Sequence, residues 1–244
     1  MKWSKRKSFG QHTLKDNRVL ARIINASQIN REDTVYEAGT GNGVLTEELC
    51  KNAKLVTSFE IDSQIFKKVL YLSSSYSNLR LINADIFKIY QLEFDVFVSN
   101  LPYSRSKDAL QWLPFQKFKR AIIMTQKEFV DKLQAKPGES NFRAITVLSQ
   151  YCFNIERLFN VSKEAFDPEP YVESTVIRLI PRSTTINKNT ISNLNLLFSQ
   201  RNKKASSVLS KKFGTKITYD DKKIDQLSVT ELMEMAHSRR KILL

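Results

Sequence analysis

The chain contains few of the residues that bind metals or form disulfides. Its 244 residues include two cysteines, Cys50 and Cys152, and two histidines, His12 and His237. Two distant cysteines form no disulfide framework, and a zinc site needs clustered Cys and His ligands. We therefore expect two buried free thiols, a reducing cytoplasmic environment and no bound metal.

Long apolar segments are also missing. No apolar run reaches the ~18 residues of a membrane span, and the basic N-terminus lacks the apolar stretch of a secretory signal. A content of 41% hydrophobic and 26% charged residues is that of a globular chain. The length suits one large domain, alone or with a small appendage. We expect a monomer that does not associate with membranes.

The charge of the chain lies at its two ends. The formal net charge is +14, of which residues 1–31 carry +7, residues 182–244 carry +8 and residues 32–181 carry −1. One interpretation of the two basic ends is that they are solvated tails whose charge only keeps the protein soluble. Two basic ends on a near-neutral middle indicate a polyanion-binding surface, and we favour nucleic acid as the partner.

Strand-like and helix-like segments alternate along the middle of the chain. Asp16 is placed to cap a first helix, and the glycine-rich residues 39–43 precede a helix over 44–52. Such alternation predicts an α/β fold with a parallel sheet and helical crossovers. The predicted strands cover residues 34–38, 55–59, 79–82, 94–98, 121–124, 151–158 and 172–179.

A polar linker follows residue 181, and the pattern beyond it is helical. Apolar stripes recur at helical spacing, and Ser228 and Glu231 have the spacing of a capping box. We predict two domains, a catalytic α/β domain over 1–181 and a small all-α domain over 182–244.

The glycine loop and two acidic strand ends indicate a nucleoside-containing cofactor. In Glu37-Ala38-Gly39-Thr40-Gly41-Asn42-Gly43, the spacing is Gly-x-Gly-x-Gly and an acid precedes it. Both features favour S-adenosylmethionine over a dinucleotide, whose pyrophosphate needs a helix N-terminus. Glu60 ends the second strand and can accept ribose hydroxyls, whereas Asp85 ends the third and can accept from an adenine amine. Each acid could alternatively cap the helix that follows it.

The fourth strand ends in Asn100-Leu101-Pro102-Tyr103. Pro102 cannot extend a central strand and restricts Leu101, so the segment predicts a stiff corner at the carboxyl end of the sheet. An amide beside an aromatic ring suits a flat heterocycle, which the amide binds at its edge and the ring at its face. The alternative is a proline-terminated strand with a surface tyrosine.

Taken in order, these motifs resemble the rRNA adenine N6-dimethyltransferase family, which includes the KsgA-type small-subunit enzymes and the Erm resistance enzymes. The resemblance covers nearly the whole chain. It also includes the segments Phe9-Gly10-Gln11-His12-Thr13-Leu14, Phe166-Asp167-Pro168-Glu169-Pro170-Tyr171-Val172-Glu173-Ser174 and Phe198-Ser199-Gln200-Arg201-Asn202-Lys203-Lys204.

The resemblance implies a Rossmann-like, S-adenosylmethionine-dependent methyltransferase sheet and assigns site residues to it. The target amine would be held by Asn100 and Leu101 on the corner stiffened by Pro102, and Tyr103 and Phe166 would sandwich the base. The cofactor-binding residues would be His12, Leu14, Gly39, Gly41, Glu60, Ile61, Asp85, Ile86 and Asn100. The RNA-binding residues would be Lys5, Arg6, Lys7, Arg105, Lys107, Arg201, Lys203 and Lys204, although Arg105 and Lys107 could equally be the solvated start of a helix.

The implied activity is N6-dimethylation of two adjacent adenines near the 3′ end of small-subunit rRNA, with rRNA in a small subunit or its precursor as partner. An Erm-type large-subunit enzyme is the alternative within the family. A non-catalytic assembly or transcription factor that keeps the fold is disfavoured by the intact corner and by Glu60. A dinucleotide oxidoreductase is disfavoured by the glycine spacing and the basic ends.

Overall fold

A computed structural model describes residues 12–208 and 221–237 of the chain. The predicted RNA contacts Lys5, Arg6 and Lys7 lie outside these residues. Contacts group the chain into two units, residues 1–130 with 154–181 and residues 131–153 with 182–244. The predicted domains, 1–181 and 182–244, differ from this grouping in residues 131–153, whose helix α7 (Ala144–Cys152) contacts later helices of the second unit.

The first unit is built on a seven-stranded sheet with the order β4-β3-β2-β5-β6-β9-β7. Strands β2 to β6 are parallel, and β9 runs antiparallel to β6. The bounds are β2 Thr34–Ala38, β3 Leu55–Phe59, β4 Leu79–Ile82, β5 Val96–Asn100, β6 Arg120–Gln126, β7 Phe153–Val161 and β9 Ser174–Pro181. The predicted α/β class and the three strands at 34–38, 55–59 and 79–82 are thereby confirmed.

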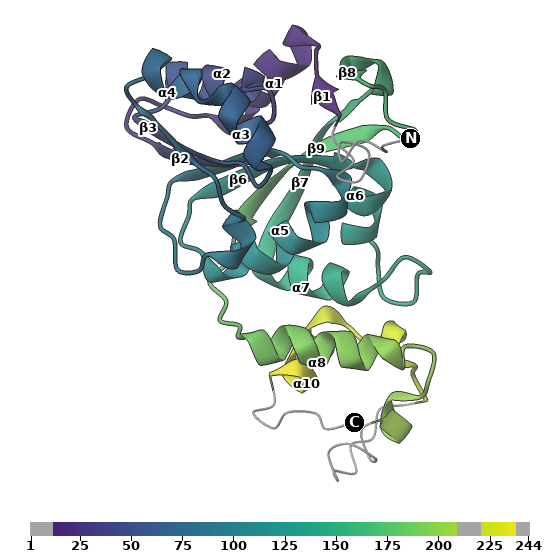
Figure 1. The fold of residues 1–244 in the computed structure, drawn as a ribbon. Helices are drawn as coiled ribbons and strands as arrows, with labels where there is room; N and C mark the ends of the chain where they lie inside the picture. Colours follow the sequence, from purple (N-terminus) through teal and green to yellow (C-terminus); the bar gives the residue numbers. More distant parts are fainter. Residues whose placement is uncertain (1–11, 209–220, 238–244) are drawn as a thin grey trace. The chain divides into compact units, whose positions relative to one another are not determined.

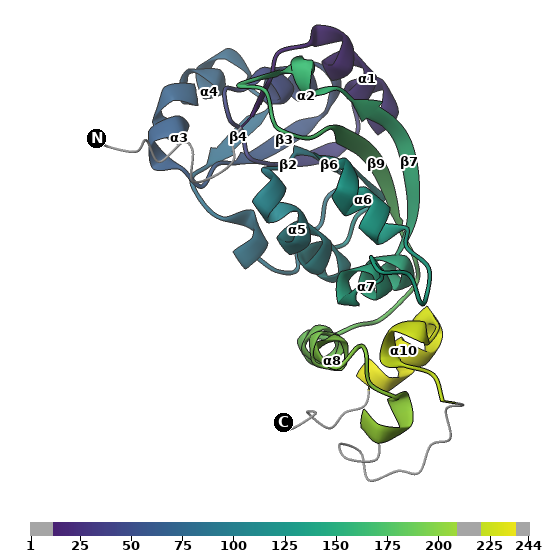
Figure 2. The same cartoon turned by 90° about the vertical axis from the view of Figure 1, so that its right-hand side faces the viewer.

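Helices cover both faces of this sheet, as the two views of the ribbon show (Figures 1 and 2). One face carries α1 Asn17–Ser27, α2 Val44–Asn52, α3 Ser63–Val69 and α4 Tyr71–Ser75, and the other carries α5 Ser106–Trp112 and α6 Lys127–Leu133. The core between α1–α4 and the sheet includes Leu20, Ile23, Leu49 and Val56, all of them buried. Short 3-10 helices at Ile86–Lys88 (η2), Tyr103–Arg105 (η3), Leu113–Phe115 (η4) and Lys163–Ala165 (η5) join these elements.

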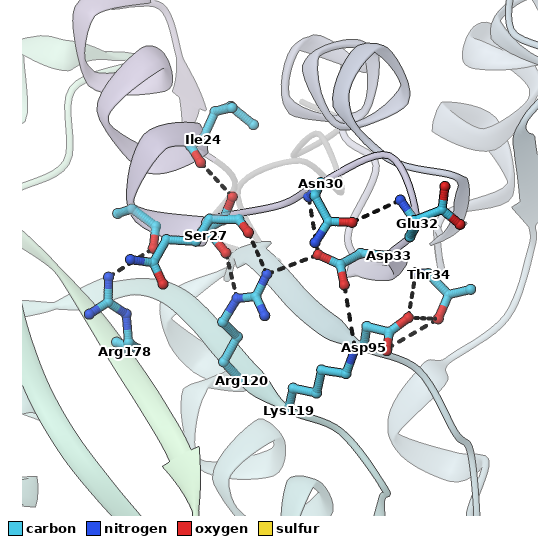
Figure 3. A network of polar contacts seen from close by, with 12 residues as sticks. Ile24, Ser27, Asn30, Glu32, Asp33, Thr34, Asp95, Lys119, Arg120 and Arg178 are labelled. Carbon is cyan, nitrogen blue, oxygen red and sulfur yellow. Dashed lines mark hydrogen bonds and ion pairs between the residues drawn. The ribbon is translucent and has the colours of Figure 1, made fainter.

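Helix α1 begins and ends with polar contacts. The Asp16 carboxylate accepts from the backbone amides of Arg18 and Val19, as the predicted N-cap requires. At the other end, Arg120 donates to the carbonyls of Ser27 and Gln28 and pairs with the Asp33 carboxylate at 3.0 Å (Figure 3). Since helix C-terminal carbonyls lack intrahelical partners, this network ties α1 to β6.

A second, two-stranded sheet pairs β1 (Thr13–Leu14) with β8 (Phe166–Asp167) in antiparallel register. Leu14 lies opposite Phe166, and both side chains are buried in the main core. This pairing joins the N-terminal segment to the chain just before β9, a contact that strand periodicity does not reveal in elements of two residues.

The second unit packs α7, α8 (Lys188–Ser199) and α10 (Val229–Ala236) against one another, with η6 at Ile224–Gln226. Asn193 donates from its side chain to the Ala236 carbonyl at 2.9 Å. Ser228 and Glu231 form the predicted capping box. The strand predicted from residue 151 begins at Phe153, because α7 runs through Cys152. The polar residues Thr146, Ser149 and Gln150 recur at helical spacing, which is a signal for α7 that the strand prediction overlooked.

Both cysteines are buried free thiols, as expected. Within residues 12–208 and 221–237, no helix is long and apolar enough to cross a membrane.

Candidate active site

The carboxyl ends of four parallel strands form the candidate site. From β2, the strands β3 and β4 extend the sheet in one direction, and β5 and β6 extend it in the other. The order therefore reverses between β2 and β5, and ligands of open α/β sheets bind at such a switch point. The glycine loop follows β2, Glu60 follows β3, Asp85 follows β4, and the Asn100 corner ends β5. The structure thus brings all four predicted features to one edge of the sheet.

The glycine loop presents bare backbone at this edge. Gly39 and Gly41 have positive φ values of 84° and 59°, which favour glycine over residues with a side chain. A Cβ built on either residue would meet no atom within 4 Å. The amide of Gly39 donates to the Phe59 carbonyl at 2.7 Å, which anchors the loop to the end of β3. Open space above an anchored loop lets a ligand approach the backbone closely.

Glu60 is a buried carboxylate with acceptor capacity to spare. It is 2% exposed, and its two oxygens accept from the backbone amides of Gly41 at 3.1 Å and Asp62 at 2.9 Å. Desolvation raises the pKa of Glu60, and these two amides oppose that rise. Each oxygen retains a lone pair. The carboxylate can therefore accept two hydroxyls of a bound diol.

Glu37, which precedes the glycine loop near the end of β2, is also buried. One carboxylate oxygen accepts from the hydroxyls of Thr46 and Ser58, both at 2.6 Å, whereas the other is buried without a partner among the described residues. Desolvation is the main cause that raises the pKa of Glu37 to about 7, and the nearby charge of Glu60 adds to the rise. A buried carboxyl group with a pKa near neutrality therefore precedes the glycine loop.

Asp85 both caps η2 and holds an arginine. Its Oδ1 accepts from the Phe87 amide, and Nη2 of Arg105 contacts Oδ1 at 2.8 Å and Oδ2 at 2.9 Å. The predicted neighbours of a cofactor differ in exposure, since Ile86 is 3% and Ile61 is 48% exposed.

The corner after β5 is held rigidly except for one amide. Leu101 is buried, and its N–H donates to the Met124 carbonyl at 3.2 Å; Ser99 donates to the Ala38 carbonyl at 2.6 Å. Arg105 N–H donates to the Pro102 carbonyl at 2.8 Å and closes the turn. The Asn100 side chain is half-buried and makes no hydrogen bond to the residues that the structure describes. An amide on a fixed frame is thus available to a ligand.

Tyr103, the aromatic end of the corner, is oriented by its hydroxyl. That hydroxyl and Ser174 Oγ lie 2.8 Å apart, and the ring centroid lies 5.7 Å from that of His12. Burial raises the pKa of Tyr103, and the hydrogen bond with Ser174 opposes the rise. His12 Nδ1 lies 2.7 Å from the Pro168 carbonyl oxygen.

Phe166 lies in the core rather than at the surface, since it is 1% exposed. Its predicted stacking on a base stays a prediction, and in this structure the ring packs in the same core cluster as Leu14. Sequence reasoning gave no role to Ser174, although it ends the segment that began at Phe166. The signal in the sequence that could have indicated a role for Ser174 was its place in the same motif as Phe166.

The predicted RNA contacts lie in both units. Arg105 is paired as described, and Lys107 is exposed at the start of α5. In the second unit, Arg201 donates to the Ser140 carbonyl at 3.3 Å, and Lys204 pairs with the exposed Asp221 at 2.7 Å. Lys203 is also exposed. In the part of the chain that the structure describes, no three His, Cys, Asp or Glu side chains gather as metal ligands would.

Comparisons with known proteins agree on one family. The model of a family described as ribosomal RNA adenine dimethylase matches residues 2–243. A ribosomal RNA small subunit methyltransferase A from Thermotoga maritima is 32% identical over 241 residues, which cover 98% of this chain and 86% of that protein. A probable ribosomal RNA small subunit methyltransferase A from Methanosarcina acetivorans is 35% identical over 225 residues, covering 90% and 84%.

Solved structures with the same fold include a dimethyladenosine transferase from Plasmodium falciparum. It is 26% identical, with a TM-score of 0.77 over 92% of this chain and 96% of that one. The 23S rRNA methyltransferase ErmE shares the fold at 24% identity, with a TM-score of 0.62 over 92% of this chain and 99% of its own.

Proposed function

The chain belongs to the ribosomal RNA adenine dimethylase family and is an rRNA adenine dimethyltransferase, and we propose that it methylates N6 of two adjacent adenines near the 3′ end of small-subunit rRNA. We further propose that S-adenosylmethionine is the donor, that the protein acts as a cytoplasmic monomer, and that its substrate is a small subunit or its precursor.

The observation that carries this proposal is the Asn100 amide. Unlike the hydroxyls of Ser99 and Tyr103, it makes no hydrogen bond to the described residues, and it ends the strand beside the glycine loop. An exocyclic adenine amine has a lone pair delocalised into the ring, so it needs acceptors that fix its N–H bonds. The amide oxygen of Asn100 and the carbonyl of Leu101 are suited to that task, and positioning of this kind supplies much of a rate.

The residues at the neighbouring strand ends fit a nucleoside cofactor. The open backbone at Gly39 and Gly41 allows close approach, and Glu60 has acceptor capacity for a ribose diol. Asp85 retains acceptor capacity for an adenine amine. Bound S-adenosylmethionine would supply the electrophilic methyl group on its sulfonium. His12, Leu14, Ile61 and Ile86 complete the proposed cofactor contacts.

The aromatic ring of Tyr103 provides the second half of target binding. Stacking on one base contributes roughly 1–3 kcal/mol, which offsets the cost of taking the base out of its stack. The hydrogen bond between the Tyr103 hydroxyl and Ser174 fixes the long axis of the ring before a base arrives. This preorganisation lowers the ordering cost of binding.

The RNA surface is proposed from charge. The exposed cations Lys107, Lys203 and Lys204, together with Arg201 and the N-terminal Lys5, Arg6 and Lys7, would contact phosphate groups. We propose that residues 182–244 form the RNA-binding appendage. Neutralising Arg201, Lys203 and Lys204 together should reduce the slope of log K against log salt by up to about 3, whereas an unchanged slope would exclude this segment from the RNA surface.

The substrate can be identified by a methyl-transfer assay. The enzyme is incubated with isotopically labelled S-adenosylmethionine and, separately, small and large subunits that lack the modification, and labelled nucleotides are mapped. We expect two adjacent dimethylated adenines near the 3′ end of the small-subunit rRNA. Label confined to large-subunit RNA would favour the Erm-type alternative, and no label in either would overturn the proposal.

A further inference from the structure

Arg105 was predicted to contact RNA, yet its guanidinium faces the proposed cofactor side of the site. Nη2 lies 2.8 Å from Asp85 Oδ1 and 2.9 Å from Oδ2, and Nε lies 3.1 Å from Asp108 Oδ2. The guanidinium carbon also lies 5.0 Å from the centroid of the Phe87 ring. Three groups therefore hold the cation, which leaves it poorly placed to turn toward an RNA phosphate.

The contacts of Asp85 leave a defined acceptor capacity. A carboxylate has about four lone-pair positions. On Oδ1 these are used by the Phe87 amide at 3.1 Å and by Arg105, and on Oδ2 one is used by Arg105. By this count, a single position on Oδ2 remains among the described residues. One fixed acceptor suits one N–H of an exocyclic amine.

The ion pair between Asp85 and Arg105 is partly shielded from water, which strengthens the hydrogen bonds between them. The Asp85 side chain is 11% exposed and the Arg105 side chain 28%. Charge-assisted hydrogen bonds of this kind are short and directional, so they restrict rotation of the carboxylate. Arg105 is itself fixed by the turn that follows the Asn100 corner, through its N–H and the Pro102 carbonyl. The arginine thus connects the target-base corner to the residue proposed to receive adenine.

We propose that Arg105 is a positioning residue for the cofactor, which orients the Asp85 carboxylate so that its one available lone pair selects an amine at position 6 of the purine. This inference rests on the proposed function, in which Asp85 receives the adenine of S-adenosylmethionine. A hypoxanthine ring has a keto oxygen at that position and would face the carboxylate with an acceptor. Discrimination between the two purines therefore reports on the orientation of Asp85.

The test measures affinity for S-adenosylhomocysteine and S-inosylhomocysteine by calorimetry with the full chain. Wild-type protein should bind the adenosyl compound roughly 10- to 100-fold more tightly. Arg105→Met, which keeps the aliphatic stem, should reduce this ratio to about 3 or less, mainly by weakening the adenosyl compound. Arg105→Lys, which keeps charge but not the planar fork, should give an intermediate ratio.

The control is Lys88→Met, which removes an exposed positive charge three residues beyond Asp85. It should leave the ratio unchanged. Matching thermal unfolding of all variants confirms that folded protein is compared. A second readout is the salt dependence of RNA binding, which Arg105→Met should not alter.

The possible outcomes distinguish a wrong cofactor site from a wrong role for Arg105. Wild-type protein that binds neither compound, or binds both equally, would overturn the proposed cofactor site and this inference with it. Wild-type discrimination that persists in Arg105→Met would overturn the role of Arg105 alone. An Arg105→Met variant that binds both compounds equally more weakly would also overturn the role of Arg105. A slope of RNA affinity against salt that this variant reduces by about one would overturn it too, and would indicate that Arg105 contacts a phosphate.

Discussion

The buried carboxyl group of Glu37 predicts that stability depends on pH in a way one substitution can isolate. Glu37 is 1% exposed, and desolvation is the main cause that raises its pKa from 4.5 to about 7. A raised carboxyl pKa means that the folded state binds the proton more tightly than the unfolded chain does. The resulting stabilisation is complete below pH 4.5 and is lost as pH rises through about 7.

The magnitude follows from the two pKa values. Each pKa unit corresponds to about 1.4 kcal/mol, so the loss between pH 5 and pH 8 is about 2.5 kcal/mol. Glu37→Gln is neutral at every pH. Its amide oxygen can accept from Thr46 and Ser58 as the carboxyl does, and its NH₂ group occupies the position that has no partner. The variant therefore mimics the protonated wild type.

Thermal unfolding followed by circular dichroism at pH 5, 6, 7 and 8 tests this. The Tm of Glu37→Gln should exceed that of wild type by about 5–10 °C more at pH 8 than at pH 5. Glu32→Gln, the same substitution at an exposed position, controls for the loss of one negative charge. A Tm difference between wild type and Glu37→Gln that stays constant from pH 5 to pH 8 would refute the reasoning.

Three further substitutions test the site and its support. Glu60→Gln should weaken S-adenosylhomocysteine roughly 10- to 100-fold in calorimetry, because one amide oxygen cannot replace both carboxylate oxygens; unchanged affinity would remove Glu60 from the site. Arg120→Met should lower the free energy of unfolding by about 3 kcal/mol, since Asp33 loses its closest cation; a change under about 0.5 kcal/mol in urea titration would contradict this. Phe166→Ala should cost about 3–5 kcal/mol because the ring is buried, whereas wild-type stability would show that the ring is dispensable to the core.

The parallel part of the sheet could be predicted closely from the sequence. Its strands are short apolar runs bounded by glycine, acids and proline, and the bounds of β2, β3 and β4 match the predicted residues. The register and order that bring Glu60 beside Gly41 could not be derived from periodicity, which carries no information on neighbours. Order follows instead from the crossover connections and from packing of the whole unit.

Other features needed long-range contacts that no local pattern encodes. The pairing of Leu14 with Phe166 joins segments about 150 residues apart, and it puts the Phe166 ring in the core. The ion pair between Arg105 and Asp85 joins a residue predicted to contact RNA with one predicted to contact the cofactor. Charge and motif could suggest each residue, but only the fold shows that the two meet.

The central claim is that the corner after β5 receives the target adenine beside a cofactor held by the neighbouring strand ends. Single-turnover methyl transfer by Tyr103→Ala, measured together with affinity for S-adenosylhomocysteine, tests it most directly. We expect a rate lowered roughly 10- to 100-fold, an affinity changed less than about twofold, and recovery of most of the rate in Tyr103→Phe, which keeps the ring. A Tyr103→Ala enzyme that transfers methyl groups at the wild-type rate, or that loses affinity for S-adenosylhomocysteine as much as it loses rate, would contradict it.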